Sequence, residues 1–402
     1  MDDSRGRAQA LDAADPLADY RSRFVIDDPD LVYLDGNSLG RPPRWTAARL
    51  AALVRDGWGG DLIRGWDDWL DLPERVGDLV GSGLLGARPG ETIVADSTTT
   101  NLYRLALAAL EARPGRRAIV LDRDEFPTDR YVLEGLASSR GLDLRWIGRD
   151  PAAGPSVGEI EALLDRDVAL VVLSHVDYRS AAIADMTAIS AAVHGAGALA
   201  LWDLCHSVGA IPVDLTTGGA DLAVGCTYKY LNGGPGSPAF LYVRSELQGT
   251  LRNPVQGWFG RRDQFAMGPG YEPEPGIRSW LTGTPPVGGL VAVEEGARLV
   301  IEAGIDAIRA KGVALTGYAI ELHDAWLAPL GCTLGSPRDP ARRGAHVSIR
   351  HPDAGELTRR LIDTGVVPDF RAPDSIRLGL APLYTRFVDV WTGIDRLRGL
   401  IR

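Results

Sequence analysis

Lys229 is the residue of this chain best suited to covalent chemistry. It stands between Tyr228 and Tyr230, ahead of the glycine-rich stretch 231–236, and follows an apolar run at 220–224 that predicts a buried strand. In an open α/β sheet, ligands bind beyond the carboxyl ends of the strands. Desolvation there favours the neutral amine of a lysine, which can act as a nucleophile and form a Schiff base. On this segment alone, a lysine in a surface loop is the competing interpretation.

Asp203 and His206 follow a second apolar run, 198–202, and are expected at the same edge of the sheet. A pyridoxal phosphate enzyme needs a lysine for the cofactor aldehyde and a carboxylate that keeps the pyridine nitrogen protonated. Asp203 followed by Lys229 fits that requirement. Taken singly, Asp203 is also explained as a helix N-cap and His206 as a buried structural histidine.

Two further turns could complete such a site. Thr98 and Thr99 lie between a predicted strand, 91–95, and a predicted helix, 101–111. Hydroxyls and N–H groups at a helix start attract an anion such as a phosphate, although a Ser/Thr cap without a ligand is the plainer interpretation. Phe126, after a predicted strand at 117–121, could stack on a pyridine ring or belong to the core.

The composition is that of a globular enzyme. The 402 residues, 45% hydrophobic and 24% charged, suffice for a full core and a smaller second domain. A net charge of -10 and a pI near 5.2 argue against a nucleic-acid surface. The sequence shows no signal-peptide pattern and no apolar stretch of membrane-spanning length, so we expect a cytoplasmic protein. Three scattered cysteines and dispersed histidines predict neither disulfides nor a metal site.

Strands and helices are expected to alternate along most of the chain, which predicts an α/β fold with a mainly parallel sheet. Further strands are expected at 31–34, 142–147, 167–174, 346–350 and 375–380, and helices at 44–54, 129–139, 186–195, 355–365 and 385–400. A long helical region should follow the Gly/Pro-rich segment 282–289. We expect a large domain at 55–288, a small α+β domain at 289–402, and an N-terminal segment, 1–54, packed with the small domain.

Several motifs together resemble those of the kynureninase family, bacterial type. They are GNSLG at 36–40, FPTD at 126–129, SHVDY at 174–178, WDLCHSVGA at 202–210, GCTYKYLNGGPGS at 225–237, GWFG at 257–260 and APLY at 381–384. Kynureninases are fold-type-I pyridoxal phosphate hydrolases of the aspartate aminotransferase superfamily. The resemblance therefore implies a large domain with a seven-stranded, mainly parallel sheet, a smaller C-terminal α+β domain, and that cofactor.

The resemblance also assigns roles to individual residues. Lys229 would bind the cofactor aldehyde, Asp203 the ring nitrogen, and Phe126 the ring face. The other cofactor-contact positions are Thr98, Thr99, Asp129, Ser174, His206, Tyr228, Trp258 and Thr284, of which the last two come from a neighbouring subunit and imply a homodimer. The positions for substrate binding are Arg377 for the carboxylate and Trp58, Asn37 and Gly283 for the remainder.

The implied reaction is hydrolysis of the Cβ–Cγ bond of L-kynurenine to anthranilate and L-alanine in the tryptophan pathway. Lys229, Asp203 and Tyr228 would be catalytic, with Tyr228 as general acid–base at the ketone. Departures from the family, Asp177 and the run 179–182, leave fine substrate tuning open. The alternative is a kynureninase that acts on 3-hydroxy- or otherwise ring-substituted kynurenine in secondary metabolism.

Two other classes of protein are kept as alternatives. A cysteine desulfurase needs a mobile, exposed cysteine, and Cys332 is the only one in the C-terminal region. A non-catalytic pyridoxal phosphate protein is the other alternative. The presence of Asp203, Lys229, Tyr228 and Arg377 argues against it.

Overall fold

The computed structural model describes residues 4–148, 150 and 152–401. Residues 1–3 of the expected N-terminal segment and residue 402 of the expected small domain lie outside these ranges. Its main feature is a seven-stranded sheet with the order β2-β8-β7-β6-β5-β3-β4. The strands are β2 (Thr92–Val94), β3 (Ala118–Asp122), β4 (Asp143–Ile147), β5 (Val168–Ser174), β6 (Leu199–Asp203), β7 (Leu222–Gly225) and β8 (Phe240–Val243). Among these strands, β8 pairs antiparallel with β2 and with β7, and every other neighbouring pair is parallel. The expected α/β fold with a mainly parallel sheet is confirmed.

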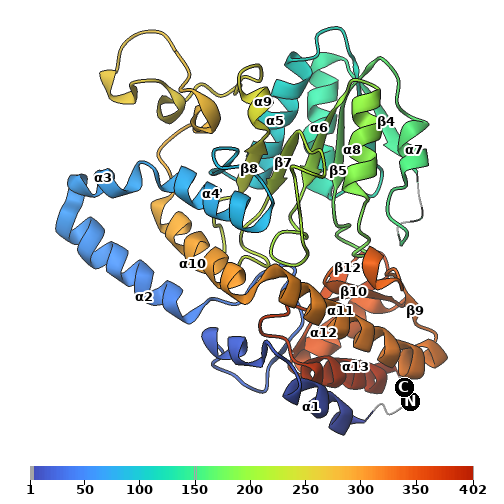
Figure 1. Ribbon diagram of the computed structural model, residues 1–402. Coiled ribbons are helices and arrows are strands. Elements are labelled where there is room, and N and C mark those ends of the chain that lie inside the picture. The colour runs from blue at the N-terminus through green and yellow to red at the C-terminus, as the bar shows by residue number, and fades with distance from the viewer. Residues whose placement is uncertain (1–3, 149, 151, 402) are drawn as a thin grey trace.

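Helices cover both faces of this large sheet, which explains why its strands are continuous apolar runs. In β5, Val171 and Leu173 pack into one core, whereas Leu170 and Val172 pack into another on the opposite face. In Figure 1, α5 (Thr98–Glu111), α6 (Pro127–Arg140) and α8 (Met186–Gly195) lie beside the sheet, with α7 (Val157–Glu161) near β4. The sheet is therefore a rigid support for the turns at its edge.

Some elements differ from the sequence-based expectation. Strand β8 and helix α4 (Leu72–Leu84) were not predicted, and the long helical region after 286 is broken at Gly304. Gly304 has φ +80°, which a glycine adopts readily, and it separates α10 (Val287–Ala303) from α11 (Ile305–Leu322). Helices α5 and α6 begin earlier than expected, because Ser97 caps α5 and Pro127 opens α6.

A second, four-stranded sheet lies in the C-terminal third, in the order β12-β13-β10-β9. Its strands are β9 (Thr333–Leu334), β10 (His346–Arg350), β12 (Asp369–Arg371) and β13 (Ser375–Gly379). Helices α11, α12 (Ala354–Asp363) and α13 (Phe387–Ile401) lie with it in the lower part of Figure 1.

The N-terminal segment lies against this small sheet and its helices. Helix α1 (Arg5–Ala13) contacts α13, and β1 (Val32–Tyr33) pairs in parallel with β11 (Val366–Val367).

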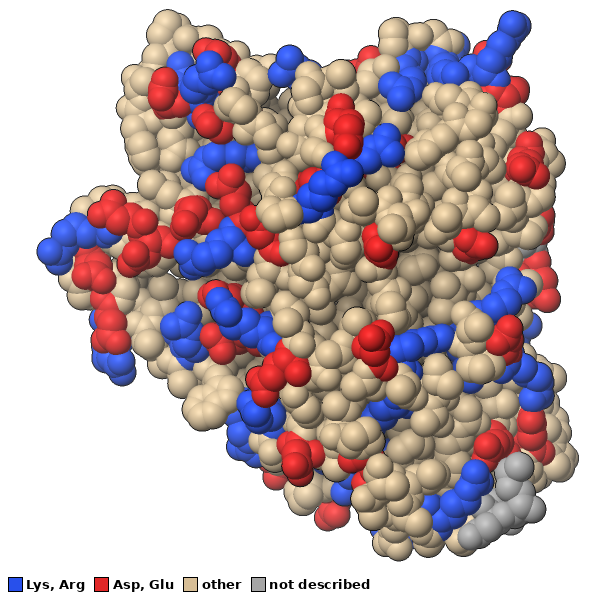
Figure 2. All heavy atoms as spheres, in the orientation of Figure 1, with Lys and Arg blue, Asp and Glu red and all other residues tan. Residues whose placement is uncertain are grey.

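Two segments project from the same side of the molecule, at the left of Figure 1. One is the arm formed by α2 (Arg44–Ala52), the helical turns 53–65 and α3 (Trp66–Trp69); the other is the loop around residues 255–275. Both carry exposed large apolar side chains: Trp45, Val54, Trp58, Leu62 and Ile63 on the arm, and Val255, Trp258, Phe265 and Met267 on the loop. Figure 2 shows charges of both signs interspersed over this view. Within the described ranges, no helix has the length and apolarity needed to cross a membrane.

Candidate active site

The predicted site residues from the large sheet gather where β5, β6 and β7 end. Ser174 is the last residue of β5 and lies beside Asp203, the last residue of β6, which in turn pairs with Val224 of β7. Lys229 stands on the turn that follows β7. Parallel strands deliver their carboxyl ends to one edge, so three segments distant in sequence meet there.

Lys229 is a buried amine without a carboxylate partner. Its side chain makes no ion pair among the residues that the structure describes, and its Nζ lies 3.2 Å from Nε2 of His206 and 5.8 Å from the centre of the Phe126 ring. Burial and the Lys229 charge lower the pKa of His206 well below its usual range, so this imidazole is neutral and can accept from the amine. The sequence contains one other lysine, Lys311, which is also buried and is paired with Asp15 at 2.6 Å.

Asp129 and Asp203 form a buried pair of carboxyl groups near Lys229. Asp129 is 1% exposed in the first turn of α6, and its Oδ2 has no hydrogen-bond partner among the described residues. Burial, followed by the charges of Asp203 and Glu125, raises the pKa of Asp129 well above its ordinary value. Asp203 is held by the backbone N–H of Cys205, which donates to its Oδ1 at 2.6 Å. Two such carboxyl groups require a shared proton or a cationic partner.

An aromatic ring and a thiol lie near these groups. Phe126 packs edge-on against Tyr178, with ring centres 5.3 Å apart, and the Lys229 amine lies over its ring. Cys205 lies 3.9 Å from the Thr98 hydroxyl at the start of α5. Thr98 and Thr99 are in the first turn of that helix, where backbone N–H groups lack intrahelical acceptors.

The hydroxyl of Ser174 is already hydrogen-bonded within the protein. Its backbone N–H donates to Oε2 of Glu125 at 2.8 Å, and its hydroxyl donates to Oε1 of the same residue. Burial raises the pKa of Glu125 to about 7. Ser174 thus anchors a carboxyl group that lies behind Asp129.

Tyr228 joins the lysine turn to the N-terminal loop. Its carbonyl accepts from the N–H of Gly40 at 2.8 Å, and its ring lies 6.0 Å from the Lys229 amine. The neighbouring Cys226 and burial raise the pKa of the phenol above its ordinary value. Tyr228 is therefore a proton donor at neutral pH.

Arg377 lies on the small sheet, and its guanidinium already has hydrogen-bond partners within the protein. It is fully buried on β13 and donates to the carbonyl of Tyr178, to Oγ of Ser38 at 2.9 Å and to the carboxylate of Asp369. Asn37, also fully buried, fits with its amide oxygen accepting from Nε of Arg377 at 2.8 Å and its nitrogen donating to Asp35. The GNSLG loop thus lies directly over the arginine.

These side chains fit pyridoxal phosphate. The orphaned Oδ2 of Asp129 beside Asp203 suits a protonated ring nitrogen, and the amine of Lys229 suits an aldehyde. The ring of Phe126 suits the flat face of a pyridine, and the start of α5 suits a phosphate. Among the described residues, no cluster of metal-ligating groups competes with this interpretation.

The remaining predicted site residues are not brought into this cluster within one chain. Trp58 is 66% exposed on the arm and Trp258 is 38% exposed on the projecting loop. Gly283 and Thr284 are exposed in the bend before α10. No hydrogen bond, ion pair or ring contact in the described ranges joins any of the four to Lys229 or Asp203.

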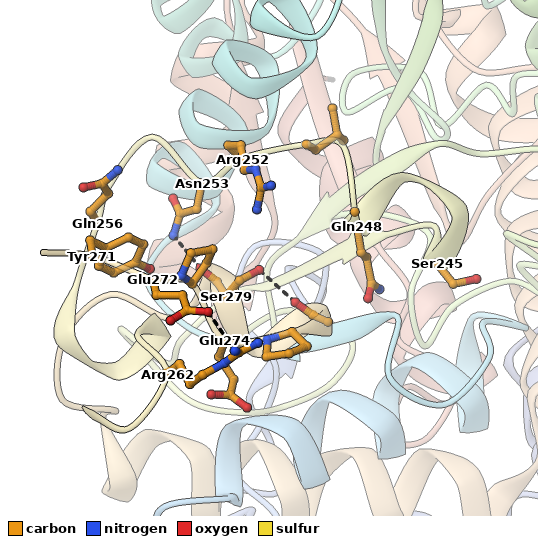
Figure 3. A pocket seen from close by; sticks show the side chains of 15 residues that line it. Ser245, Gln248, Arg252, Asn253, Gln256, Arg262, Tyr271, Glu272, Glu274 and Ser279 are labelled. Atoms are coloured by element: carbon orange, nitrogen blue, oxygen red, sulfur yellow. Dashed lines mark hydrogen bonds and ion pairs between the residues drawn. The ribbon is translucent and has the colours of Figure 1, made fainter. Parts of the chain in front are cut away.

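A cavity of about 830 Å³ opens near α9 (Ser245–Gln248), away from these residues. In Figure 3, dashed lines join some of its polar side chains to one another or to the backbone. Arg262 pairs with Glu272, and Asn253 donates to the carbonyl of Ser279. None of the predicted site residues lines it, and we do not assign it to the chemistry.

Some residues at the site were not identified from the sequence. Glu125, Asp369 and His346 lie outside the quoted motifs, although the predicted strand at 346–350 included His346, and Cys205 lies in the motif at 202–210 without an assigned role. Asp177, noted as a departure from the family, accepts from the N–H groups of Arg179 and Ser180 and so shapes a turn.

The chain was compared with known proteins. The family model described as the kynureninase C-terminal domain matches residues 308–397. A kynureninase of Pseudomonas fluorescens is 44% identical over 98% of this chain and 94% of its own length; one of Burkholderia pseudomallei is 44% identical over 99% and 95%.

Solved structures share the fold at low identity. A cysteine desulfurase of Thermococcus onnurineus has a TM-score of 0.83 at 19% identity, covering 95% of this chain and 97% of that one. A cysteine desulfurase of Escherichia coli has a TM-score of 0.81 at 17% identity, covering 96% and 98%. These likenesses show the fold of pyridoxal phosphate enzymes of type I, and the near full-length identity decides the family. The chain belongs to the kynureninase family.

Proposed function

We propose that this protein hydrolyses the Cβ–Cγ bond of L-kynurenine, giving anthranilate and L-alanine, with pyridoxal phosphate as cofactor. The observation that carries the proposal is the buried Lys229, which has no ion-pair partner among the described residues, near the carboxyl pair of Asp129 and Asp203. Family membership supports the substrate, because the curated relatives that match nearly the whole chain are named kynureninase.

The cofactor, when bound, draws electrons from the substrate carbons attached to it. Lys229 would hold its aldehyde and, once displaced by the substrate amine, would move the proton at the substrate Cα. Asp203, with Asp129 behind it, would keep the ring nitrogen protonated, and Phe126 would hold the ring face. Thr98 and Thr99 would bind the phosphate at the start of α5.

The protein's own groups also act on the ketone and on the carboxylate. Tyr228, whose raised pKa keeps its proton in place, would donate a hydrogen bond to the ketone oxygen as water adds and the carbon–carbon bond breaks. Arg377 would bind the substrate carboxylate after its present partners rearrange, since a guanidinium pairs well with a carboxylate. Asn37 and Ser38 lie close enough to share that contact.

We further propose a homodimer in which Trp258 and Thr284 complete the partner's cofactor site, and Trp58 and Gly283 its substrate pocket. The exposed apolar side chains on the arm and the loop support this, because isolated chains rarely expose such patches. The proposal includes a large domain at 55–288, a small domain at 289–402 with the segment 1–54 packed against it, and a cytoplasmic location in tryptophan breakdown.

The desulfurase alternative is not favoured by the position of Cys332. Its side chain is 4% exposed just before β9, and its N–H donates to the carbonyl of Leu327. Burial also raises the pKa of its thiol, which disfavours the reactive thiolate.

The test is release of fluorescent anthranilate from L-kynurenine by the cofactor-loaded protein. The matched control is Lys229→Ala, and reduction with borohydride followed by peptide mapping should place the cofactor on Lys229 rather than on Lys311, the one other lysine. Anthranilate release that survives in Lys229→Ala, or a label on Lys311, would refute the proposal.

A further inference from the structure

His346 is a fully buried imidazole at the site for which the proposed mechanism has no use. It is the first residue of β10, and the register pairs it with Gly379 and pairs Ser348 with Arg377. His346, Ser348 and Arg377 therefore share one face of the small sheet. Val347 and Ile349 point to the other face, into the core of the C-terminal third.

That shared face meets the loop after β5. The hydroxyl of Ser348 donates to the carbonyl of Arg179, and Arg377 donates to the carbonyl of Tyr178. The Arg179 carbonyl favours the charged form of His346, and the same carbonyl accepts from Ser348. Both ring nitrogens of His346 lack a hydrogen-bond partner in the part of the chain that the structure describes.

The orphaned imidazole lies between the two cationic groups of the site. Its ring centre is 5.7 Å from that of His206, whose Nε2 is 3.2 Å from the Lys229 amine. Burial, then the charges of Arg377 and Lys229, lowers the pKa of His346 well below its usual range, so it is neutral. A neutral imidazole has one N–H donor and one acceptor nitrogen. Leaving both unpaired in a buried position is costly, which points to a ligand group that uses them.

Arg377 alone is poorly prepared for a carboxylate, because its donors are bound to Tyr178, Ser38, Asp369 and Asn37. His346 is its diagonal neighbour across the β10–β13 pair, on the side nearer to His206. An amino acid whose amine replaces that of Lys229 and whose carboxylate reaches toward Arg377 must pass beside His346.

We propose that His346 donates a hydrogen bond to the α-carboxylate of the bound amino acid and shares that carboxylate with Arg377. The inference rests on the proposed function, because it needs an amino-acid substrate at this site. It makes His346 a specificity-determining residue for the carboxylate.

The test is binding of L-alanine to the cofactor-loaded protein, followed by the change in cofactor absorbance. In His346→Leu, which is similar in bulk but has no donor, the Kd for L-alanine should rise by about ten- to a hundredfold, the range for a hydrogen bond to a charged group. His346→Gln keeps an N–H and should remain within about threefold of wild type. Ethylamine, which is alanine without its carboxylate, should bind His346→Leu and wild type alike.

If His346 only stabilised the fold, its replacement would lower the Tm. The proposal predicts the opposite. Without ligand, His346→Leu should have a Tm equal to or above that of wild type, because an unsatisfied buried polar ring is replaced by an apolar one. The matched control is His323→Leu, which also removes a buried imidazole with an orphaned Nε2 but lies outside the site. It should leave L-alanine affinity unchanged.

The inference is overturned by unchanged L-alanine affinity in His346→Leu, by an equal loss for ethylamine, or by a lowered Tm. These results are distinguishable from failure of the proposed function. If L-alanine binds in a His346-dependent manner but L-kynurenine releases no anthranilate, the proposed reaction fails and the carboxylate contact stands. If anthranilate is released and His346→Leu binds L-alanine normally, only the contact fails.

Discussion

Gly40, the last residue of the GNSLG motif, is expected to be irreplaceable because it touches the backbone of Lys229, the lysine proposed to be catalytic. A Cβ built on Gly40 would lie 2.2 Å from the carbonyl oxygen of Lys229 and 2.3 Å from Oδ1 of Asn232. Such contacts are essentially never closer than 3.0 Å, so Gly40→Ala must move the Lys229 carbonyl, or the loop, by at least 0.8 Å (3.0 − 2.2). Overpacking of this kind costs about 1–3 kcal/mol. At about 2.1 cal/mol/K per residue over the 402 residues, that corresponds to a fall in Tm of about 1–4 °C.

The effect on catalysis should be larger than the effect on stability. Displacing a reacting group by about 1 Å can cost about a hundredfold, so kcat/KM for anthranilate release should fall by about that factor in Gly40→Ala. Fluorescence measures the rate, and thermal unfolding measures the Tm. The control is Gly249→Ala, because Gly249 has φ −75° and an added Cβ meets nothing within 4 Å. A Gly40→Ala protein with kcat/KM within about threefold of wild type would refute the argument, since the close approach would then not be rigid.

Three further predictions concern strain, titration and assembly. Ala181 has φ +65°, a left-handed conformation that costs a non-glycine residue about 1 kcal/mol. Ala181→Gly should therefore slightly raise the free energy of unfolding measured in urea, and a decrease would contradict this. Burial raises the pKa of Glu125 from 4.5 to about 7. Between these two pH values, the folded, cofactor-free protein keeps a proton on Glu125 that the unfolded chain has lost. The free energy of unfolding should therefore fall by about 3 kcal/mol as the pH rises from about 4.5 to 7. Glu125→Gln should consequently lose less stability than wild type between pH 5 and pH 8 in urea titrations, and parallel curves would exclude the assignment. Phe265→Asp should weaken the proposed dimer in sedimentation velocity whereas Tyr131→Asp, equally exposed on α6, should not; two equal profiles would place the interface elsewhere.

Much of the large sheet was readable from the sequence because its strands are short apolar runs, buried on both faces, separated by polar turns. Strand β8 was not predicted because it closely follows the glycine-rich turn. Its direction depends on pairing with β7, the preceding strand, and with β2, which is remote in sequence. Lys229 and Asp203 could be paired in advance, since both follow predicted parallel strands. Asn37 and Arg377 meet only through packing of the N-terminal loop on the small sheet, which no local pattern encodes.

His346 illustrates the same limit. The strand that carries it was predicted, but nothing in the sequence shows that its ring lies near His206 and Arg377 without a hydrogen-bond partner among the described residues. Trp58, Trp258, Gly283 and Thr284 were assigned by the family resemblance alone, and a second copy of the chain is needed to test those assignments.

The scarcity of lysine has a practical consequence for an enzyme that captures an aldehyde. Free pyridoxal phosphate condenses with accessible amines, and on most proteins the surface lysines compete for it. Here 41 of the 43 basic residues are arginines, and both lysines are buried, one of them within an ion pair. Apart from the chain terminus, Lys229 is thus the one amine placed to accept the cofactor. The amount of cofactor fixed by borohydride should therefore count active sites directly, without correction for labelling elsewhere.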